Sequence, residues 1–322
     1  MGKVSFYYST LLSLPKAPPF DLCCHLRKIN TIQFQSPLPY RGNTTTTTAT
    51  MTRPRTMTLP TTPGRTPAIY KPASVPNPDP AHGAAFIFLH GLGDSAEGLE
   101  SKQLEALVEN TAPDNQPDIA DQFQQNSKVP YMHWVFPNAK LNNEVRATAW
   151  YHPTQWSDRP ELQEPEDERG MLESVSYVES LIDACVAKGI PPQRIVLGGF
   201  SQGCAMALLT DLTSSKYAGH LAGIVGLMGY LPLCDRLPDL RAKSGLPVQH
   251  GDVPVFLARG SKDQLIPKRI YDQSLKAMHM AGVSSSSLEA KEYEGVGHEL
   301  NGAVLKDLSQ FLSRVVPDLG SF

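Results

Sequence analysis

The chain has 322 residues, of which 41% are hydrophobic and 19% charged, and its net charge of −3 gives no sign of nucleic-acid binding. No run of 18 or more apolar residues occurs, so no membrane-spanning helix is predicted. The five cysteines have neither metal-ligand spacing nor a paired framework, so no metal site is predicted and reduced thiols in an intracellular setting are favoured.

Residues 1–66 form a basic tail rich in Ser, Thr and Pro. Its first 65 residues contain eight Lys or Arg and one acid and so carry +7, whereas the rest of the chain carries −10. The low periodicity and the threonine run at 44–48 are typical of disorder. A mitochondrial transit peptide and a translation start at Met51 or Met57 both stay open as interpretations. The folded domain is placed at residues 67–322.

The folded part alternates between short apolar runs and amphipathic stretches. The apolar run at 84–91 predicts a strand, and a helix is expected at about 97–109. A polar insert at 113–128 leads to a second predicted strand at 131–137. After an acidic loop, apolar residues at 171–185 recur every three or four positions, which predicts an amphipathic helix.

The alternation continues to the end of the chain. The further predicted elements are strand 194–200, helix 202–212, apolar run 221–229, strand 253–260, helix 269–281, strand 287–295 and helix 299–315. This order predicts an α/β fold, with a mostly parallel central sheet and helices on both faces. Ligands of such sheets bind at the carboxyl ends of the strands, so functional residues are expected directly after the apolar runs.

A Gly-x-Ser-x-Gly pattern lies between strand 194–200 and helix 202–212. Its serine is Ser201, and Gly199 and Gly203 lie two positions away on either side. A serine here can simply cap the helix. The same pattern also forms a tight strand-to-helix turn that presents a nucleophile, with glycines where a Cβ atom does not fit. Ser201 is therefore the candidate nucleophile if a base and an oxyanion site lie nearby.

His298 is the candidate general base, because it lies directly after the last predicted strand. The other histidines that follow Ser201 precede strands or fall within a helix: His220, His250 and His279. Asp263 is the candidate acid, because it lies in the loop after strand 253–260 and keeps the chain order Ser, Asp, His of α/β-hydrolases. A solvated loop histidine and an Asx turn are the ordinary alternatives for these two residues.

The oxyanion site requires backbone N–H groups that face the developing charge. One is expected from Gln202, the residue after the candidate nucleophile. The second is expected from Leu92, because Gly91 and Gly93 let the backbone of this loop approach a substrate.

Six short motifs resemble one known family. They are HGLGDS at 90–95, FPNA at 136–139, AWY at 149–151, GGFSQG at 198–203, DQLIP at 263–267 and YEGVGH at 293–298. Together they resemble the acyl-protein thioesterase branch of the phospholipase/carboxylesterase family, from about Ala84 to the C-terminus. The resemblance implies a single-domain α/β-hydrolase of the cytosol that uses no cofactor. Relatives remove S-linked fatty acyl groups from proteins and also cleave lysophospholipids and small esters.

Four features depart from the family pattern. Ser261 stands where similar proteins commonly have Asp, and His152 stands where the family has Asp after its aromatic pair. The segment between His152 and the following helix is longer and more acidic, and the insert at 113–128 is also unusual. Because these changes lie in loops expected to border the substrate site, they bear on substrate choice and leave the three candidate catalytic residues unaffected.

These observations predict a serine hydrolase that cleaves palmitoyl-type S-acyl thioesters on proteins through an acyl-enzyme intermediate. A broad carboxylesterase or lysophospholipase acting on small or lipid esters uses the same residues and stays an alternative. A catalytically silent binding module is a second alternative, against which the intact set of site residues argues. Cys204 is a weaker candidate nucleophile because it falls inside the helix. Apolar residues at 226–233 are open to transient membrane contact, a dimer contact or burial.

Overall fold

The computed structural model describes residues 57–319 except 76, 78, 100–128, 130, 158, 160 and 161, and all of them belong to one compact unit. The tail as far as residue 56, the polar insert at 113–128 and most of the helix predicted at 97–109 lie outside the described residues. Of that helix, the first turn is described and begins at Ala96.

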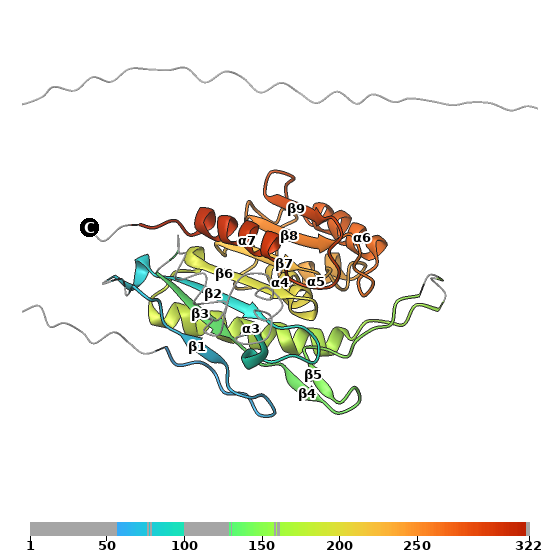
Figure 1. The fold of residues 1–322 in the computed structure, drawn as a ribbon, viewed down its shortest axis with the longest axis horizontal. Coiled ribbons are helices and arrows are strands. Elements are labelled where there is room, and N and C mark those ends of the chain that lie inside the picture. Colours follow the sequence, from blue (N-terminus) through green and yellow to red (C-terminus); the bar gives the residue numbers. More distant parts are fainter. Residues whose placement is uncertain are drawn as a thin grey trace, which may run out of the picture. The chain divides into compact units, whose positions relative to one another are not determined.

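A seven-stranded sheet runs through the described domain (Figure 1). Its strand order is β1-β3-β2-β6-β7-β8-β9, in which β1 pairs antiparallel with β3 and all other neighbours are parallel. The strands are β1 (Ile69–Lys71), β2 (Ala84–Leu89), β3 (Met132–Phe136), β6 (Ile195–Phe200), β7 (Gly223–Leu227), β8 (Val255–Gly260) and β9 (Leu288–Tyr293). The mostly parallel sheet that was predicted from the alternation of elements is confirmed.

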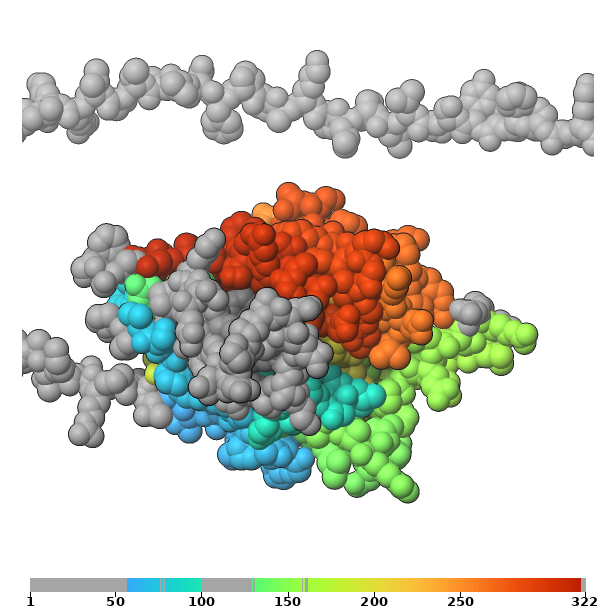
Figure 2. Space-filling view, viewed as in Figure 1, coloured from blue at the N-terminus to red at the C-terminus, as the bar shows by residue number. Residues whose placement is uncertain are grey.

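Helices cover both faces of this sheet, as predicted. They are α3 (Glu168–Lys188), α4 (Gln202–Thr213), α5 (Leu237–Lys243), α6 (Lys268–Met280) and α7 (Gly302–Val315). Side chains alternate between faces along each strand. Along β2, Ile87 and Leu89 join a core with α3, α4, α5 and α6, whereas Phe86 and Phe88 join a second core with α7. In Figure 2 the orange and red segments that carry α6 and α7 form one continuous surface.

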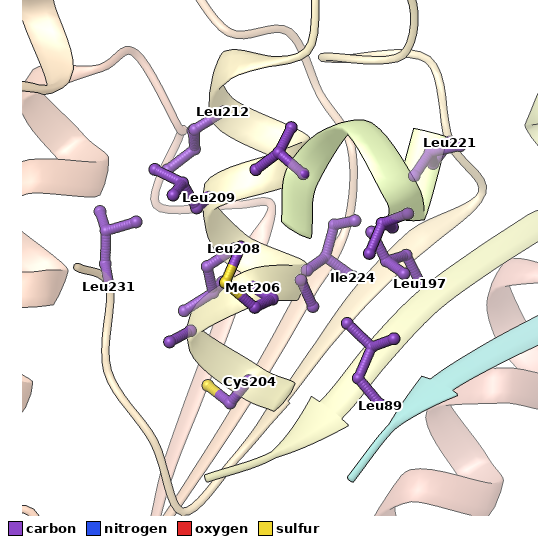
Figure 3. Close-up of a cluster of buried hydrophobic side chains, with 14 of the residues drawn as sticks. Leu89, Leu197, Cys204, Met206, Leu208, Leu209, Leu212, Leu221, Ile224 and Leu231 are labelled. Carbon is purple, nitrogen blue, oxygen red and sulfur yellow. The ribbon is translucent and has the colours of Figure 1, made fainter. Parts of the chain in front are cut away.

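The most buried helix is α4, in which every residue is buried. Figure 3 shows how Leu208 and Leu212 of this helix lie among apolar side chains of its neighbours, including Leu231. Neighbouring elements therefore enclose this helix on all sides. Its first residue directly follows Ser201, so the core fixes the position of the candidate nucleophile.

Capping residues determine where α3 and α7 begin or end. Asp167 caps the first turn of α3, and Gly189 ends the helix with a left-handed φ of 107°. The last helix was expected to begin at about Glu299, but α7 begins at Gly302. The reason is that the Asn301 side chain accepts hydrogen bonds from two backbone amides of the first turn.

The domain begins earlier than residue 67, where the sequence placed its boundary. Met57 is only 6% exposed and belongs to the core that contains α4. The Arg65 guanidinium lies 4.3 Å from the ring centroid of Tyr177 and 5.3 Å from that of Trp150. Residues 57–66 thus pack through isolated contacts with distant residues, and such contacts leave no periodic pattern in the sequence.

Candidate active site

Ser201 occupies the sharp turn between β6 and α4. Its φ of 55° and ψ of −117° place it in a strained region that non-glycine residues rarely adopt. Its backbone N–H donates to the Leu227 carbonyl of the neighbouring strand β7 at 2.9 Å. The side chain makes no capping hydrogen bond to α4, so the helix-cap interpretation does not hold for its hydroxyl.

Gly199 and Gly203 make this turn possible. A Cβ atom on Gly199 would lie 2.3 Å from the Gly203 carbonyl carbon. One on Gly203 would lie 2.1 Å from the Leu89 carbonyl oxygen. Because both obstacles are backbone atoms, no change of rotamer can relieve either clash. The glycine spacing noted in the sequence is therefore a requirement of the backbone packing between β6, α4 and β2.

The structure brings the three candidate catalytic residues together from distant parts of the chain. His298 Nε2 lies 2.9 Å from Ser201 Oγ, and His298 Nδ1 lies 2.8 Å from Asp263 Oδ2. In the neutral ring, Nδ1–H donates to the carboxylate and Nε2 accepts from the serine hydroxyl. This arrangement suits removal of the hydroxyl proton by the histidine.

Asp263 is held as an ionised acceptor. Its Oδ1 accepts hydrogen bonds from the Leu265 and Ile266 amides at 2.9 and 3.0 Å, while Oδ2 faces His298. Burial alone raises the pKa of this carboxyl, but the hydrogen bonds from His298 and the two amides outweigh it and lower the pKa below its usual value. The carboxylate is thus suited to orient the ring and to stabilise its positive charge.

Ser261, one of the departures from the family pattern, ties the aspartate loop to the histidine loop. Its Oγ accepts a hydrogen bond from the Gly295 amide at 2.8 Å, and its own N–H donates to the Tyr293 carbonyl. A carboxylate at this position would bring a second negative charge close to Asp263. The hydroxyl makes the loop contact without that charge.

The loop predicted to supply an oxyanion donor passes directly over Ser201. A Cβ atom on Gly91 would lie 3.2 Å from Ser201 Cβ, so this glycine permits the close approach. The next residue, Leu92, is 43% exposed and lines the same cavity as Ser201. Within the hydrogen bonds of the described residues, neither the Leu92 amide nor the Gln202 amide is used.

His90 fixes this loop, a role that the sequence did not reveal. Its Nδ1–H donates to the Gly91 carbonyl at 2.7 Å, and its Nε2 accepts from the Ala139 amide at 3.0 Å. Trp150 Nε1 donates to the His90 carbonyl at 2.8 Å. Burial lowers the pKa of the ring, which favours the neutral form that both side-chain hydrogen bonds require. The HGLGDS and AWY motifs carried the signal for this contact.

Gln202 also does more than supply a backbone amide. Its side-chain Oε1 accepts from the Trp150 amide at 3.1 Å, and its Nε2 donates to the Tyr151 carbonyl at 3.2 Å. Asn138 of the FPNA motif makes a comparable link, since its Oδ1 accepts from the Ala96 amide at 2.8 Å. These amide side chains hold the loops around the site by paired contacts that depend on the tertiary fold.

A cavity of about 660 Å³ opens in front of Ser201. Its apolar lining consists of Leu92, Tyr151, Pro153, Trp156, Phe200, Tyr230, Leu265, Ile266 and Pro267. The Trp156 and Tyr230 rings meet edge to face at 4.8 Å, and the hydroxyl of Tyr230 lies 3.0 Å from that of Tyr151. The cavity therefore offers an apolar surface next to the candidate nucleophile.

Cys204, His152 and His250 do not line this cavity. Cys204 is fully buried in the core around α4, and burial raises the pKa of its thiol, which does not suit a nucleophile (Figure 3). His152 is exposed, and its Nδ1 lies 3.2 Å from Glu144 Oε2. His250 pairs with Asp211 in the interior at 2.7 Å.

The described residues offer neither a metal site nor a membrane-spanning helix. They contain no cluster of three or more His, Cys, Asp or Glu side chains that could hold a metal ion. In the same part of the chain, no helix is long and apolar enough to cross a membrane.

Comparisons with known proteins point to one family. The sequence model of the family described as Phospholipase/Carboxylesterase matches residues 113–316 of this chain. Acyl-protein thioesterase 1 of Schizosaccharomyces pombe is 33% identical over 247 residues, which are 74% of this chain and 94% of that protein. The protein of the same name from Yarrowia lipolytica is 31% identical over 78% of this chain and 98% of its own length. Arabidopsis thaliana SOBER1 shares the fold, with a TM-score of 0.57 at 24% identity over 73% of this chain and 99% of its own.

Proposed function

Because the chain belongs to the phospholipase/carboxylesterase family, we propose that it is a serine hydrolase that cleaves S-acyl thioesters on proteins. The observation that carries this proposal is the continuous hydrogen-bonded series from Ser201 through His298 to Asp263. It lies at the carboxyl ends of parallel strands, where α/β folds place their active sites. The names of the fungal relatives support the thioester as the bond that is cleaved.

In the first step, Ser201 Oγ attacks the carbonyl carbon of the thioester while His298 Nε2 takes the hydroxyl proton. Asp263 holds the ring in the tautomer that leaves Nε2 free to accept this proton. It also stabilises the positive imidazolium that forms. A serine hydroxyl is a weak nucleophile by itself, so the adjacent base is essential to this step.

The negative charge that develops on the carbonyl oxygen requires hydrogen-bond donors. The amides of Leu92 and Gln202 are proposed as these donors, because both flank Ser201 and neither has another partner among the described residues. Each such donor typically stabilises the transition state by about 3 kcal/mol. His90 and Trp150 hold the Leu92 loop, so this donor is in place before the substrate arrives.

Collapse of the tetrahedral intermediate releases the cysteine thiol and leaves an acyl-enzyme on Ser201. A thiol with a pKa of about 8.5 leaves readily, and as it departs it takes up the proton held by His298, which returns the ring to its neutral form. Water then enters and attacks the acyl-enzyme while His298 removes one of its protons. Collapse of this second intermediate releases the fatty acid and returns the proton from His298 to Ser201 Oγ. The apolar cavity next to Ser201 is proposed to hold the acyl chain during both steps.

The first test is steady-state hydrolysis of an S-palmitoyl peptide, a palmitoyl O-ester and an acetyl ester by the wild-type protein and Ser201→Ala. The proposal expects the palmitoyl thioester to have the highest kcat/KM and the alanine variant to be inactive towards it. A preference for the acetyl ester would instead identify a broad carboxylesterase. Failure of wild-type protein to react with a fluorophosphonate at Ser201 would indicate a silent binding module.

A further inference from the structure

Two further cavities continue from the active-site cavity along helix α6. The first, of about 660 Å³, shares Trp156, Tyr230 and Arg269 with the active-site cavity, and we call it the middle basin. The second, of about 590 Å³, shares Cys234, Asp235 and Gln273 with the middle basin, and we call it the distal cleft. Each cavity thus adjoins the next through shared lining residues, and we call the three together the trough.

One face of α6 forms a wall of this trough. Pro267 lines the active-site cavity, Ile270 the middle basin, and Ala277 and Met280 the distal cleft. Ile270, Ala277 and Met280 are seven and three residues apart, which places their side chains on one side of the helix, and Pro267 directly precedes its first turn. At 1.5 Å per residue, the trough spans about 20 Å between Pro267 and Met280. Arg269 of α6 donates to the Ser157 carbonyl at 2.8 Å, which joins the opposite wall to the helix.

The middle basin is acidic. Four carboxylates line it: Glu164, Glu166, Glu168 and Asp235. Two arginines also line it, Arg236 and Arg269, of which Arg236 pairs with Glu168 at 3.6 Å, so the carboxyl groups exceed the cations by two. Glu166 Oε2 accepts from the Leu233 amide at 2.7 Å, and burial raises the pKa of this carboxyl, so Glu164 and Asp235 are the acids that remain for a ligand. The basin therefore favours a cationic group.

The distal cleft differs from the basin in its apolar rim. Val248 is 80% exposed and Met280 is 79% exposed, the two highest values among the large hydrophobic side chains of the described residues. Both line the cleft, together with Leu237 and Ala277. Exposed apolar side chains that surround a hollow are typical of an interaction site.

An acyl chain is a poor occupant for the whole trough. To reach the distal cleft it would have to cross the middle basin, where its methylene groups would remove water from carboxylates without replacing the lost hydrogen bonds. A polypeptide suits the same path, because basic side chains can pair with the basin and an apolar side chain can enter the cleft. About six extended residues, at 3.3–3.6 Å each, span 20 Å.

We propose that the trough binds the polypeptide that flanks the acylated cysteine of a protein substrate, with basic residues in the middle basin and an apolar residue about six positions away in the distal cleft. This inference rests on the proposed thioesterase function. It assigns substrate selection to the surface that the loop around Glu164 and Glu166 forms with α6. The acyl chain then stays in the active-site cavity.

The test measures kcat/KM of the full-length protein for three S-palmitoyl substrates. One is a single blocked cysteine, and the other two add six residues on its N-terminal or C-terminal side, with lysines nearest the cysteine and leucine at the end. We expect one extended peptide to exceed the single cysteine about tenfold, the gain typical of burying one large apolar side chain. Replacing its leucine by serine, or its lysines by glutamate, is expected to abolish the gain.

Substitutions in the middle basin and the distal cleft test whether these two cavities cause the higher kcat/KM of the extended peptide. Met280→Ser and Asp235→Asn are each expected to lower the ratio of extended to single-cysteine kcat/KM several-fold. Val186→Ser is the matched control, because Val186 is an exposed apolar residue of α3 that lines none of the three cavities. It is expected to leave the ratio unchanged.

Two results would overturn the inference. Equal kcat/KM for all three thioesters would show that the trough binds no flanking polypeptide. If Met280→Ser changed the preference for acyl-chain length and not the ratio, the distal cleft would hold the acyl chain. Failure of the proposed function is distinct from both, because the single-cysteine thioester would then not be cleaved or its cleavage would survive Ser201→Ala.

Discussion

His90 holds the loop over Ser201 through one donated and one accepted hydrogen bond. Only the neutral ring offers both, because a protonated imidazole has two donors and no acceptor. Burial lowers the pKa of His90, which favours the neutral ring. The contact is therefore expected to stay intact near neutral pH. The loop over Ser201 is then expected to keep its position near neutral pH and to add no pH dependence to the proposed reaction.

Asp263→Asn tests the proposed orienting role of this carboxylate. The amide oxygen can still accept from Leu265 and Ile266, but the amide nitrogen donates to the histidine and selects the wrong tautomer. We expect kcat to fall about 10⁴-fold, which is typical of a triad whose histidine is held in the wrong tautomer. Kinetics with the S-palmitoyl peptide measure this fall, and a loss below tenfold would contradict the assignment of Asp263.

The same variant has a pH signature in stability. The folded protein lowers the pKa of Asp263, so the ionised form favours folding. The wild-type advantage in free energy of unfolding should be fully present above the ordinary pKa of about 3.9 and should disappear as pH falls through the lower folded value. Urea unfolding of both proteins between neutral and acidic pH measures this difference, and no change on acidification would argue against an ionised Asp263.

Helices and strands whose contacts lie within a short stretch of chain could be predicted from local sequence patterns. The apolar run and glycine spacing around Ser201 were enough to predict β6, the turn and α4, because neighbouring residues make these contacts. The strand β1 has only three residues, which is too short for a clear alternation of apolar and polar positions. Asn138 and Arg65 act through residues far away in sequence, and such pairs are fixed only by the tertiary fold.

Gly203→Ala tests the contact between α4 and β2. The new methyl group would meet the Leu89 carbonyl oxygen at 2.1 Å, and relief requires the helix to move away from the sheet. We expect at least about 3 kcal/mol of destabilisation, the upper end for overpacking of a core. Gly302→Ala in the first turn of α7 is the control, because its Cβ would meet no atom within 4 Å. Urea unfolding that shows equal stabilities for both variants would exclude the clash.

For the molecule as a whole, the proposed chemistry and a buried polar pair lie at opposite ends of one helix. Ser201 precedes the first residue of α4, and Asp211 lies nine residues after Gln202, which is about 14 Å along the axis. Asp211 Oδ2 lies 2.7 Å from His250 Nε2, and both side chains are at least 98% buried. The buried pair therefore joins α4 to the loop before β8 without contacting the active-site cavity.

His250→Leu separates stability from activity. The change leaves the Asp211 carboxyl buried without its partner, so we expect a loss of about 3 kcal/mol in free energy of unfolding. The double variant with Asp211→Leu removes both polar groups and is expected to recover part of that loss, because an apolar pair tolerates burial. Active-site titration with a fluorophosphonate gives the folded fraction, and kcat per titrated site should match the wild type. A tenfold fall in that kcat would mean that the far end of α4 controls the geometry of Ser201, so that the core and the site behave as one unit.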